Sequence, residues 1–393
     1  MLRLLTRLAL RECIWTAALL TAVVALVLAP QESMAGASNG LALCGNVIIP
    51  SLFPFLILSA LAVELGFAAR LGRLFEPIMR PLFRVNGACA CALVLGFIGG
   101  YPVGARTAIN LFESKLCSRT EAQRLLAFCN NSGPAFIFGV IGAGIFSDSR
   151  TGLLLYLIHA LASLCVGLVF RFYGHEKSSP SRTHPSPIRT VRFSSAFTGS
   201  VASALQSTLG ICAFVVFFSV VISLLTRFGI LSSLATLLAS LLSPFGMTEE
   251  WASYLLTGLL ELSSGVWSLS GAGSWNGKLS MAAFMLGWAG LSVHCQVLSF
   301  LTESGLSMDT YLGGKALHAV FSAALTALVL RLFPLSQPVS AYLNEAVGTL
   351  GGPDFSSVLT ISATASAVTW LFFLCSGVAL LQKSSRKRAR NAI

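Results

Sequence analysis

The amino-acid sequence predicts an all-α polytopic membrane protein, and three observations lead to this fold class. Of its 393 residues, 55% are hydrophobic and only 10% are charged, whereas soluble domains carry about 25% charged residues. Several apolar runs reach about 20 residues, the length that a helix needs to cross a hydrocarbon core of about 30 Å. Other apolar runs are interrupted by glycine, proline and polar residues at corresponding places in the two halves of the chain.

Uninterrupted apolar runs mark the membrane spans that we expect. They cover residues 13–30, 41–63, 151–172, 197–226, 310–333 and 357–382. Two semi-apolar segments, 64–86 and 227–246, are expected to be interfacial helices. The first carries four arginines between large apolar residues, a pattern typical of amphipathic helices that lie in the membrane interface.

The remaining apolar segments are broken. We expect two re-entrant hairpins at 87–112 and 250–273, and broken transmembrane helices at 123–146 and 278–302. Ser118 and Glu121 have the spacing of a capping box, which predicts that a helix begins there.

The placement of the positive charges predicts the orientation in the membrane. The net charge is +11, and basic residues gather at 3–11, in the loop 173–196 and at 383–390. Because positive residues near spans stay in the cytoplasm, we expect both termini and the central loop to be cytoplasmic. These clusters predict contact with the lipid bilayer and no nucleic-acid partner. The basic start and apolar run of the N-terminus resemble a signal peptide, but we expect a retained first span.

The two halves of the chain resemble an internal duplication. His159 and His318 are 159 residues apart in stretches of similar sequence, and Pro54-Phe55 matches Ala213-Phe214 at the same separation. Counting crossings from a cytoplasmic N-terminus gives the two repeats opposite orientation, as in many secondary transporters. We therefore divide the chain into five parts. These are an N-terminal span (1–40), a first repeat (41–172), the basic loop (173–196), a second inverted repeat (197–333), and a C-terminal span with a basic tail (334–393).

Helix breaks at membrane depth point to a binding site. They are expected at 99–104, 130–134, 261–265 and 287–292 and to converge near the midplane. Irregular backbone is tolerated there only when protein or a water-filled cavity surrounds it. Freed main-chain groups at such breaks bind substrates and ions, so we include Gly99 and Gly100 in the predicted site.

Several motifs resemble a known family. They are "SLFPFLILSAL", "EPIMRPLFRVNG", "GFIGGYPVGARTA" and "SRTEAQRLLAFCNNSGPAFIFGVIGAGIF". The chain is similar to the bacterial sporulation integral membrane protein YlbJ family, also called SpoVV. The resemblance implies a gate-type nucleoside-recognition architecture like that of concentrative nucleoside transporters. It also implies transport of dipicolinic acid across the outer forespore membrane of a bacterial cell during sporulation.

Charged residues inside apolar segments are the first site candidates, because buried charge in a membrane is costly. Arg106 meets a substrate carboxylate or extends to the cytoplasmic interface. Glu261 accepts a proton, binds Na⁺, pairs with Arg106 or partners a buried donor, and the neighbouring Ser263 and Ser264 supply oxygens. The coupling ion is therefore Na⁺ or H⁺, and no cofactor or metal is expected.

Polar and aromatic residues at the breaks complete the predicted substrate site. In the first half they are Asn130, Asn131 and Ser132, which bind substrate or cap the half-helices, and Tyr101, whose ring can stack on a flat substrate. In the second half they are Ser292, His294 and Gln296. His159 and His318 are expected to hydrogen-bond between helices, with a proton relay as the alternative.

The leading functional hypothesis is a secondary transporter for a small anionic or ring-containing solute, dipicolinate or a nucleoside-like molecule. No phosphate-binding G-x-x-x-x-G-K-[ST] pattern indicates an ATP motor. An enzyme is not expected, since H-E-x-x-H is absent and "ELSSGVW" is not a nucleophile elbow. A non-transporting sporulation membrane scaffold is the remaining alternative. The chain can also form a homo-oligomer.

Overall fold

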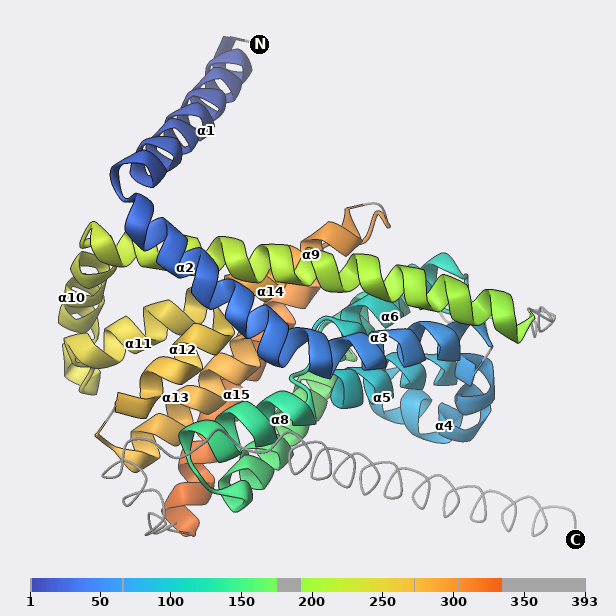
Figure 1. Cartoon of the computed structure of the whole chain (residues 1–393). Helices are drawn as coiled ribbons and strands as arrows, with labels where there is room; N and C mark the ends of the chain where they lie inside the picture. The colour runs from blue at the N-terminus through green and yellow to red at the C-terminus, as the bar shows by residue number, and fades with distance from the viewer. Residues whose placement is uncertain (1, 66, 175–191, 272, 303, 334–393) are drawn as a thin grey trace, which may run out of the picture.

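A computed structural model describes residues 2–65, 67–174, 192–271, 273–302 and 304–333. Within these ranges all regular structure is helical, which confirms the all-α fold class (Figure 1). The expected span 357–382 lies outside the described residues, as does most of the basic loop.

Four helical segments are long and apolar enough to cross a membrane. They are α8 (Ser149–Phe170), α9 (Phe193–Arg227), the broken segment Trp275–Leu301, and α15 (Asp309–Leu332). These coincide with the expected spans 151–172, 197–226 and 310–333 and with the broken span 278–302. Three bent helix pairs raise the number of candidate spans in the described residues to seven. The chain therefore has the helices of a polytopic membrane protein.

The N-terminal helices differ from the prediction. They are α1 (Leu2–Leu28), α2 (Pro30–Leu43), a π-helical turn η1 (Cys44–Ile48) and α3 (Ile49–Glu64). Residues 31–40, which lie between the expected spans 13–30 and 41–63, are helical in α2. Figure 1 shows α2 and α3 running side by side with α9, while α1 points away from the rest. Gly36 and Gly40 lie against Ser219, Ser223 and Val216 of α9, and small residues four apart allow such close helix packing.

The first half continues through a series of short helices. They are α4 (Phe67–Phe83), η2 (Gly87–Cys89), α5 (Ala90–Gly99), α6 (Val103–Glu113), α7 (Arg119–Leu126), a π-helix η3 (Ala135–Ile145), and α8. The capping box predicted at the start of α7 is confirmed, because Ser118 and Glu121 bond each other's backbone N–H. The interfacial position expected for α4 stays a prediction.

The second half has a similar sequence of elements after the long helix α9. They are α10 (Ile230–Leu242), η4 (Ser243–Phe245), α11 (Glu249–Leu260), α12 (Leu262–Ser268), η5 (Leu269–Gly271), α13 (Trp275–Trp288), α14 (Gly290–Leu301) and α15. Helices α13 and α15 pack closely, because a side chain at Gly287 would collide with the backbone of Ala319. The elements of this half are therefore held together by backbone contact at glycine.

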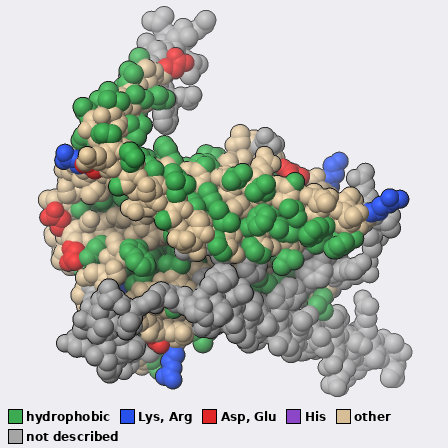
Figure 2. Space-filling view, in the orientation of Figure 1, with side chains coloured by type: hydrophobic (Ala, Val, Ile, Leu, Met, Phe, Trp, Pro, Cys, Tyr) green, Lys and Arg blue, Asp and Glu red, His purple; other side chains and the backbone are tan. Residues whose placement is uncertain are grey.

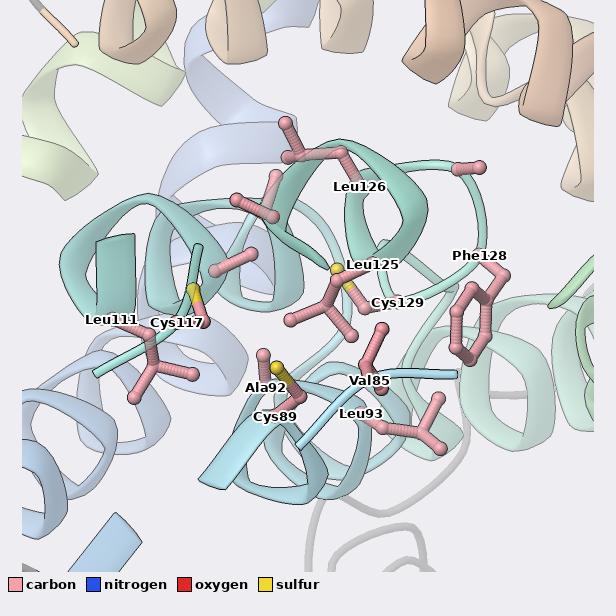
Figure 3. Packing of buried hydrophobic residues seen from close by; sticks show 14 of the residues in the cluster. Val85, Cys89, Ala92, Leu93, Leu111, Cys117, Leu125, Leu126, Phe128 and Cys129 are labelled. Carbon is pink, nitrogen blue, oxygen red and sulfur yellow. The ribbon is translucent and has the colours of Figure 1, made fainter. Parts of the chain in front are cut away.

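The hydrophobic core of the first half surrounds α5 and α7 (Figure 3). Leu93, Leu125, Leu126 and Phe128 are each at most 2% exposed. Buried cysteines that form no disulfide fill the remaining space, among them Cys89, Cys117 and Cys129. Cysteine acts here as a small apolar residue, and this packing fixes where α7 ends and the second helix break begins.

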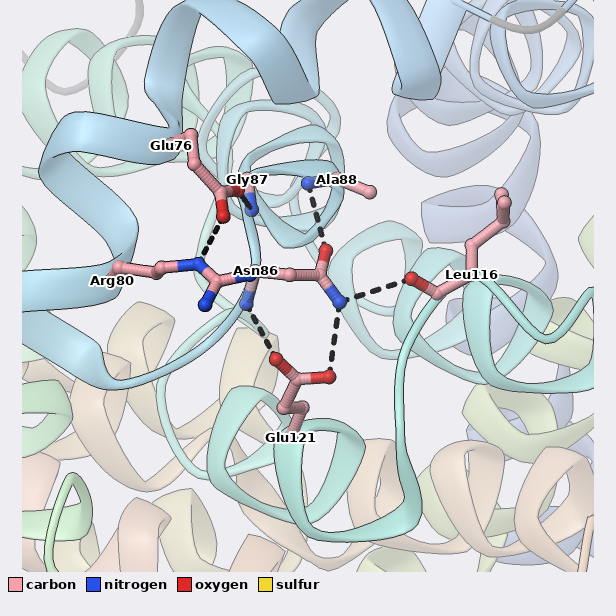
Figure 4. Close-up of polar contacts among 7 residues, drawn as sticks. All are labelled: Glu76, Arg80, Asn86, Gly87, Ala88, Leu116 and Glu121. Carbon is pink, nitrogen blue, oxygen red and sulfur yellow. Dashed lines mark hydrogen bonds and ion pairs between the residues drawn. The ribbon is translucent and has the colours of Figure 1, made fainter. Parts of the chain in front are cut away.

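A polar clamp holds the start of this core together (Figure 4). The Asn86 backbone N–H donates to Glu121 Oε1 at 2.7 Å, and Asn86 Nδ2 donates to Glu121 Oε2 and to the Leu116 carbonyl, both at 3.0 Å. Glu76 accepts from the Gly87 N–H and from Arg80. The "EPIMRPLFRVNG" motif thus has a structural role, since it ties α4 to α7.

The outer surface is apolar over the long helices. Figure 2 shows hydrophobic side chains covering the visible face of α1, α2 and α9, with Lys, Arg, Asp and Glu side chains toward its edges. Large apolar residues such as Val27, Leu209 and Leu157 are 73%, 59% and 57% exposed. An exposed apolar band of this kind is what contact with lipid requires.

Candidate functional site: a cavity between four helix breaks

All four helix breaks that the sequence predicts are present. Between α5 and α6, Gly100 takes a φ of 77°, and the Tyr101–Pro102 peptide bond is cis. Between α7 and η3, residues 130–133 are non-helical. Glu261 interrupts α11 and α12 with extended backbone, and Ala289 interrupts α13 and α14 with a φ of 81°. The predictions at 99–104, 130–134, 261–265 and 287–292 are confirmed.

Within each half the two breaks touch each other through glycine. A Cβ atom on Gly100 would lie 2.7 Å from the Gly133 nitrogen, and one on Gly290 would lie 2.9 Å from the Leu262 nitrogen. Only a residue without a side chain allows this backbone contact, and both glycines also have positive φ angles. Each half therefore brings two unwound segments into one place.

A cavity of about 80 Å³ lies where the two pairs of breaks meet. Eight of the thirteen predicted site residues line it: Gly99, Gly100, Tyr101, Ser132, Glu261, Ser263, Ser292 and Gln296. Ser132 and Ser292 are 1% and 0% exposed, and neither hydroxyl has a hydrogen-bond partner in the part of the chain that is described. Buried polar groups without a partner are costly, so the cavity offers two unused hydrogen-bonding groups, one from each half.

Glu261 is buried, with 2% of its surface exposed, at the wall of this central cavity. Its carboxylate oxygens accept the backbone N–H groups of Ser263 at 3.0 Å and Ser264 at 2.7 Å, and so cap the start of α12. Among the described residues the ion pairs are Glu76–Arg80 and Glu32–Arg227. The expected alternative of a Glu261–Arg106 ion pair is therefore wrong, because the carboxylate is engaged by its own helix.

Arg106 lies outside the central cavity. Its Nη2 donates to Ser203 Oγ at 3.1 Å, and its guanidinium lies 4.7 Å from the centre of the Phe300 ring. It lines a second hollow of about 460 Å³ between α6, α9 and α14, which we call the vestibule. The vestibule and the central cavity share Ile211 and Gln296. Arg106 thus lies in a hollow that adjoins the central cavity.

The other predicted residues lie just behind the cavity wall. Asn130 Nδ2 donates to the Tyr311 hydroxyl at 3.3 Å, and Asn131 Nδ2 donates to the Phe128 carbonyl at 3.0 Å. His294 Nδ1 lies 3.1 Å from the same Tyr311 hydroxyl. Ser264 takes part through its backbone N–H in the cap at Glu261. These residues support the breaks rather than line the cavity.

Sequence reasoning missed Lys315, which is 1% exposed in the second turn of α15. Its Nζ donates to the Asn130 carbonyl at 3.1 Å and to the Tyr101 hydroxyl at 3.3 Å, and lies 3.2 Å from His318 Nδ1. A lysine inside the apolar run 310–333 is itself a signal, because ionisable residues within spans usually mark functional sites. Lys315 connects both breaks of the first half to the second half.

His159 and His318 hydrogen-bond between helices, as expected. Their rings lie 4.3 Å apart, His318 Nε2 is 2.9 Å from the His159 carbonyl, and the Ser132 N–H donates to His159 Nε2 at 3.0 Å. The described residues contain no group of three or more His, Cys, Asp or Glu side chains that could hold a metal ion.

Comparison with known proteins gives two matches. Residues 47–175 match a family model named Gate and described as nucleoside recognition. The sporulation integral membrane protein YlbJ of Bacillus subtilis (strain 168) is 33% identical over 318 residues, which cover 76% of this chain and 78% of the relative. No solved structure gives a significant match. The relative is named as an integral membrane protein of sporulation, and the family model is described as nucleoside recognition; neither name is that of an enzyme. This chain belongs to the YlbJ family of sporulation integral membrane proteins.

Proposed function

We propose that this protein is a secondary transporter that carries a small ring-containing or anionic solute through the central cavity. One observation carries the proposal. The Ser132 and Ser292 hydroxyls come from different halves of the chain, are buried without a partner among the described residues and line the same cavity. A scaffold gains nothing from such groups, whereas a solute that bridges them satisfies both. Glycine breaks on either side supply further main-chain donors and acceptors.

Two inverted repeats explain how such a cavity opens alternately to the two sides. The α5–α6 and α11–α12 segments serve as the re-entrant hairpins in this proposal. Support comes from His159 and His318, which are separated by 159 residues and contact each other directly. Contact between equivalent residues is what a two-fold axis between repeats produces. Rocking of one repeat against the other then changes access around a fixed site.

The charge at the cavity wall restricts the solute. Glu261 contributes a carboxylate, so an anion enters only if a cation or proton accompanies it. We therefore propose coupling to Na⁺ or H⁺. Dipicolinate, the solute implied by the family resemblance, has a flat ring for Tyr101 and carboxylates for Ser132 and Ser292. Arg106 in the vestibule supplies a positive charge on the approach.

A nucleoside is the second candidate solute. The family model that matches residues 47–175 is described as nucleoside recognition. Four polar neutral side chains line the cavity: Ser132, Ser263, Ser292 and Gln296. Hydroxyl and amide groups of this kind recognise sugar hydroxyls, and a neutral solute is not repelled by Glu261. In the proposed cellular setting the protein lies in the outer forespore membrane with both termini in the cytoplasm.

Flux through purified protein in proteoliposomes tests the proposal. Vesicles loaded with unlabelled dipicolinate or uridine are diluted into the labelled solute, and exchange is followed over time. Wild-type protein is expected to exchange at least one of them. Glu261→Gln is expected to abolish exchange, and Arg106→Ala is expected to slow dipicolinate more than uridine. Glu249→Gln and Arg227→Ala are matched controls, because both residues are exposed and lie outside the cavity and vestibule.

The same assay separates the transporter from the scaffold. Absence of exchange for both solutes, with and without Na⁺ or a pH gradient, favours a non-transporting sporulation membrane scaffold. Normal exchange in both Glu261→Gln and Arg106→Ala would remove these two residues from the site and leave the cavity without its proposed role.

A further inference from the structure

Lys315 forms a second polar centre next to the central cavity. Its side chain is 1% exposed. Three acceptors surround its Nζ: the Asn130 carbonyl at 3.1 Å, His318 Nδ1 at 3.2 Å and the Tyr101 hydroxyl at 3.3 Å. The centre of the Tyr101 ring is 4.9 Å away. An ammonium group has three N–H donors, so the site accommodates the protonated lysine.

The charge of this ammonium is hydrogen-bonded but not neutralised. Within the described ranges, Lys315 forms no ion pair with a carboxylate. The titratable groups that face it are Tyr101 beside α6, Cys129 after α7, His159 on α8, His294 on α14 and His318 on its own helix. Tyr311 lies one turn earlier on α15 and contacts Asn130 and His294. None of these is an acid that is ionised at neutral pH. A buried cation without a counter-ion readily gives up its proton or attracts an anion.

The hydrogen-bond partners assign the protons of the two histidines. His318 Nδ1 accepts from Lys315, so its proton is on Nε2, which donates to the His159 carbonyl. His159 Nε2 accepts the Ser132 N–H, so its proton is on Nδ1, which has no partner within the described residues. Both rings are neutral in this arrangement. With Lys315 protonated, a proton on either ring would add a second positive charge nearby, so this arrangement holds its charge on Lys315.

Hydrogen bonds to Tyr101 and to the Asn130 carbonyl connect Lys315 with the central cavity. Tyr101 lines the cavity, and its hydroxyl accepts from Lys315 and donates to the Leu286 carbonyl of α13. Asn130 belongs to the second break, two residues from the cavity-lining Ser132. Protonation of Lys315 therefore strengthens its hydrogen bonds to Tyr101 and to Asn130, one at each break of the first half. A neutral amine donates only two hydrogen bonds and must release one of its three acceptors.

We propose that Lys315 binds the proton that this protein carries together with an anionic solute, so that transport is coupled to protons. The inference rests on the proposed function. In each cycle the Lys315 amine takes a proton from water on one side of the membrane and returns it to water on the other side. An anion in the cavity stabilises the protonated amine behind Tyr101. By thermodynamic linkage, the protonated amine increases the affinity for the anion by the same factor.

Proton movement and solute movement are measured in the same proteoliposomes, with a pH-sensitive dye inside and labelled dipicolinate outside. Wild-type protein is expected to acidify the interior as dipicolinate enters, and an interior made alkaline is expected to accelerate net uptake. Labelled uridine is run in parallel and is expected to cause less acidification for the same amount of solute moved. Solute exchange without a gradient reports on folding and binding independently of protons.

Two substitutions that fix the charge of residue 315, one neutral and one positive, sharpen the test. Lys315→Met is permanently neutral, and Lys315→Arg is permanently charged. Both are expected to lose proton movement and gradient-driven uptake. Lys315→Arg is expected to retain dipicolinate exchange, and Lys315→Met is expected to bind dipicolinate more weakly than wild type. Lys278→Met is the matched control, because this buried lysine of α13 donates only to the Ser270 carbonyl among the described residues, and its proton coupling is expected to be normal.

The outcomes separate the two proposals. Solute exchange by the wild type without any proton movement overturns the role of Lys315 while leaving the transporter intact. Proton coupling that persists in Lys315→Met or Lys315→Arg overturns it as well. If neither Lys315 variant can be purified in folded form, absence of proton movement in the wild type still overturns the role of Lys315. Absence of exchange for both solutes removes the proposed function and this inference with it.

Discussion

The two halves of the molecule hold their helix breaks in different ways. In the first half, the breaks at 99–104 and 130–134 are held by side chains from other helices, namely Lys315 from α15 and His159 from α8. In the second half, the break at Glu261 is held by its own carboxylate, which caps the helix that follows it. The break at Ala289 adds one contact, from Trp288 Nε1 to the Leu259 carbonyl at 3.3 Å.

This difference suggests a division of roles between the two halves: one wall of the cavity is held by local contacts, and the other depends on a residue that can change its protonation state. The second-half breaks are held by contacts among α11–α14. The first-half breaks are held in addition by Lys315, which belongs to the second half. A change in the protonation of Lys315 is therefore expected to act on the first-half breaks more than on the second-half breaks.

Close backbone contact at glycine occurs in both halves, and disrupting it is expected to lower the free energy of unfolding the most. Gly100→Ala places a Cβ atom 2.7 Å from the Gly133 nitrogen at a φ of 77°. The collision and the left-handed backbone together are expected to cost about 2–5 kcal/mol of unfolding free energy. The measurement is reversible unfolding in detergent micelles.

Gly199→Ala is the control for Gly100→Ala. Gly199 lies inside α9, where an added Cβ meets nothing within 4 Å, and helix propensity predicts a gain of about 1 kcal/mol. Equal effects of the two substitutions would show that the contact between Gly100 and Gly133 is not a close one.

Loss of the hydrogen bond from the Ser132 N–H to His159 of α8 is expected to have the second-largest effect on stability. His159→Leu leaves the Ser132 backbone N–H buried without its acceptor, which costs about 1–3 kcal/mol. Hydrogen exchange at residues 130–134 is expected to accelerate, while exchange at residues 262–264 stays unchanged. Leu161→Ala, on the exposed side of the same helix, is expected to change neither. Faster exchange in the second half as well would mean that the two halves are held jointly.

Loss of the Glu261 cap at the start of α12 is expected to have the smallest of these effects on stability. Glu261→Ala removes the acceptor for the N–H groups of Ser263 and Ser264, and loss of such a cap costs about 1 kcal/mol. Hydrogen exchange should accelerate at residues 262–264 only. Glu261→Gln keeps one carbonyl oxygen and should lie between the wild type and Glu261→Ala. Acceleration at 130–134 in Glu261→Ala would contradict the separation between the halves.

The breaks could be predicted from the sequence because their signals are local. Gly99-Gly100-Tyr101-Pro102 and Asn130 to Pro134 combine glycine, proline and polar residues that do not continue a helix, so each interrupts the apolar run around it. The helix over residues 31–40 was not predicted, because these residues lie between the two expected apolar spans. Gly36 and Gly40 pack on α9, a contact between segments far apart in the sequence.

The partners of Lys315 could not be predicted from the local sequence. The hydrogen bonds of Lys315 to Asn130 and Tyr101 join residues 185 and 214 positions apart, and no spacing rule links them. The same holds for the cavity itself, since a single sequence does not show that Ser132 and Ser292 line one cavity. What the sequence shows is that a lysine interrupts an apolar span, which marks the residue without naming its partners.

Equilibrium binding of labelled dipicolinate and uridine to purified Ser132→Ala and Ser292→Ala variants tests the central claim most directly. One lost hydrogen bond is worth about 1 kcal/mol, so each substitution should weaken binding of the transported solute about five-fold to tenfold. Because both hydroxyls lack a partner in the described structure, neither should lower the unfolding free energy. Unchanged binding in either variant would show that the solute does not bridge the two halves, and the cavity between them would not be the binding site.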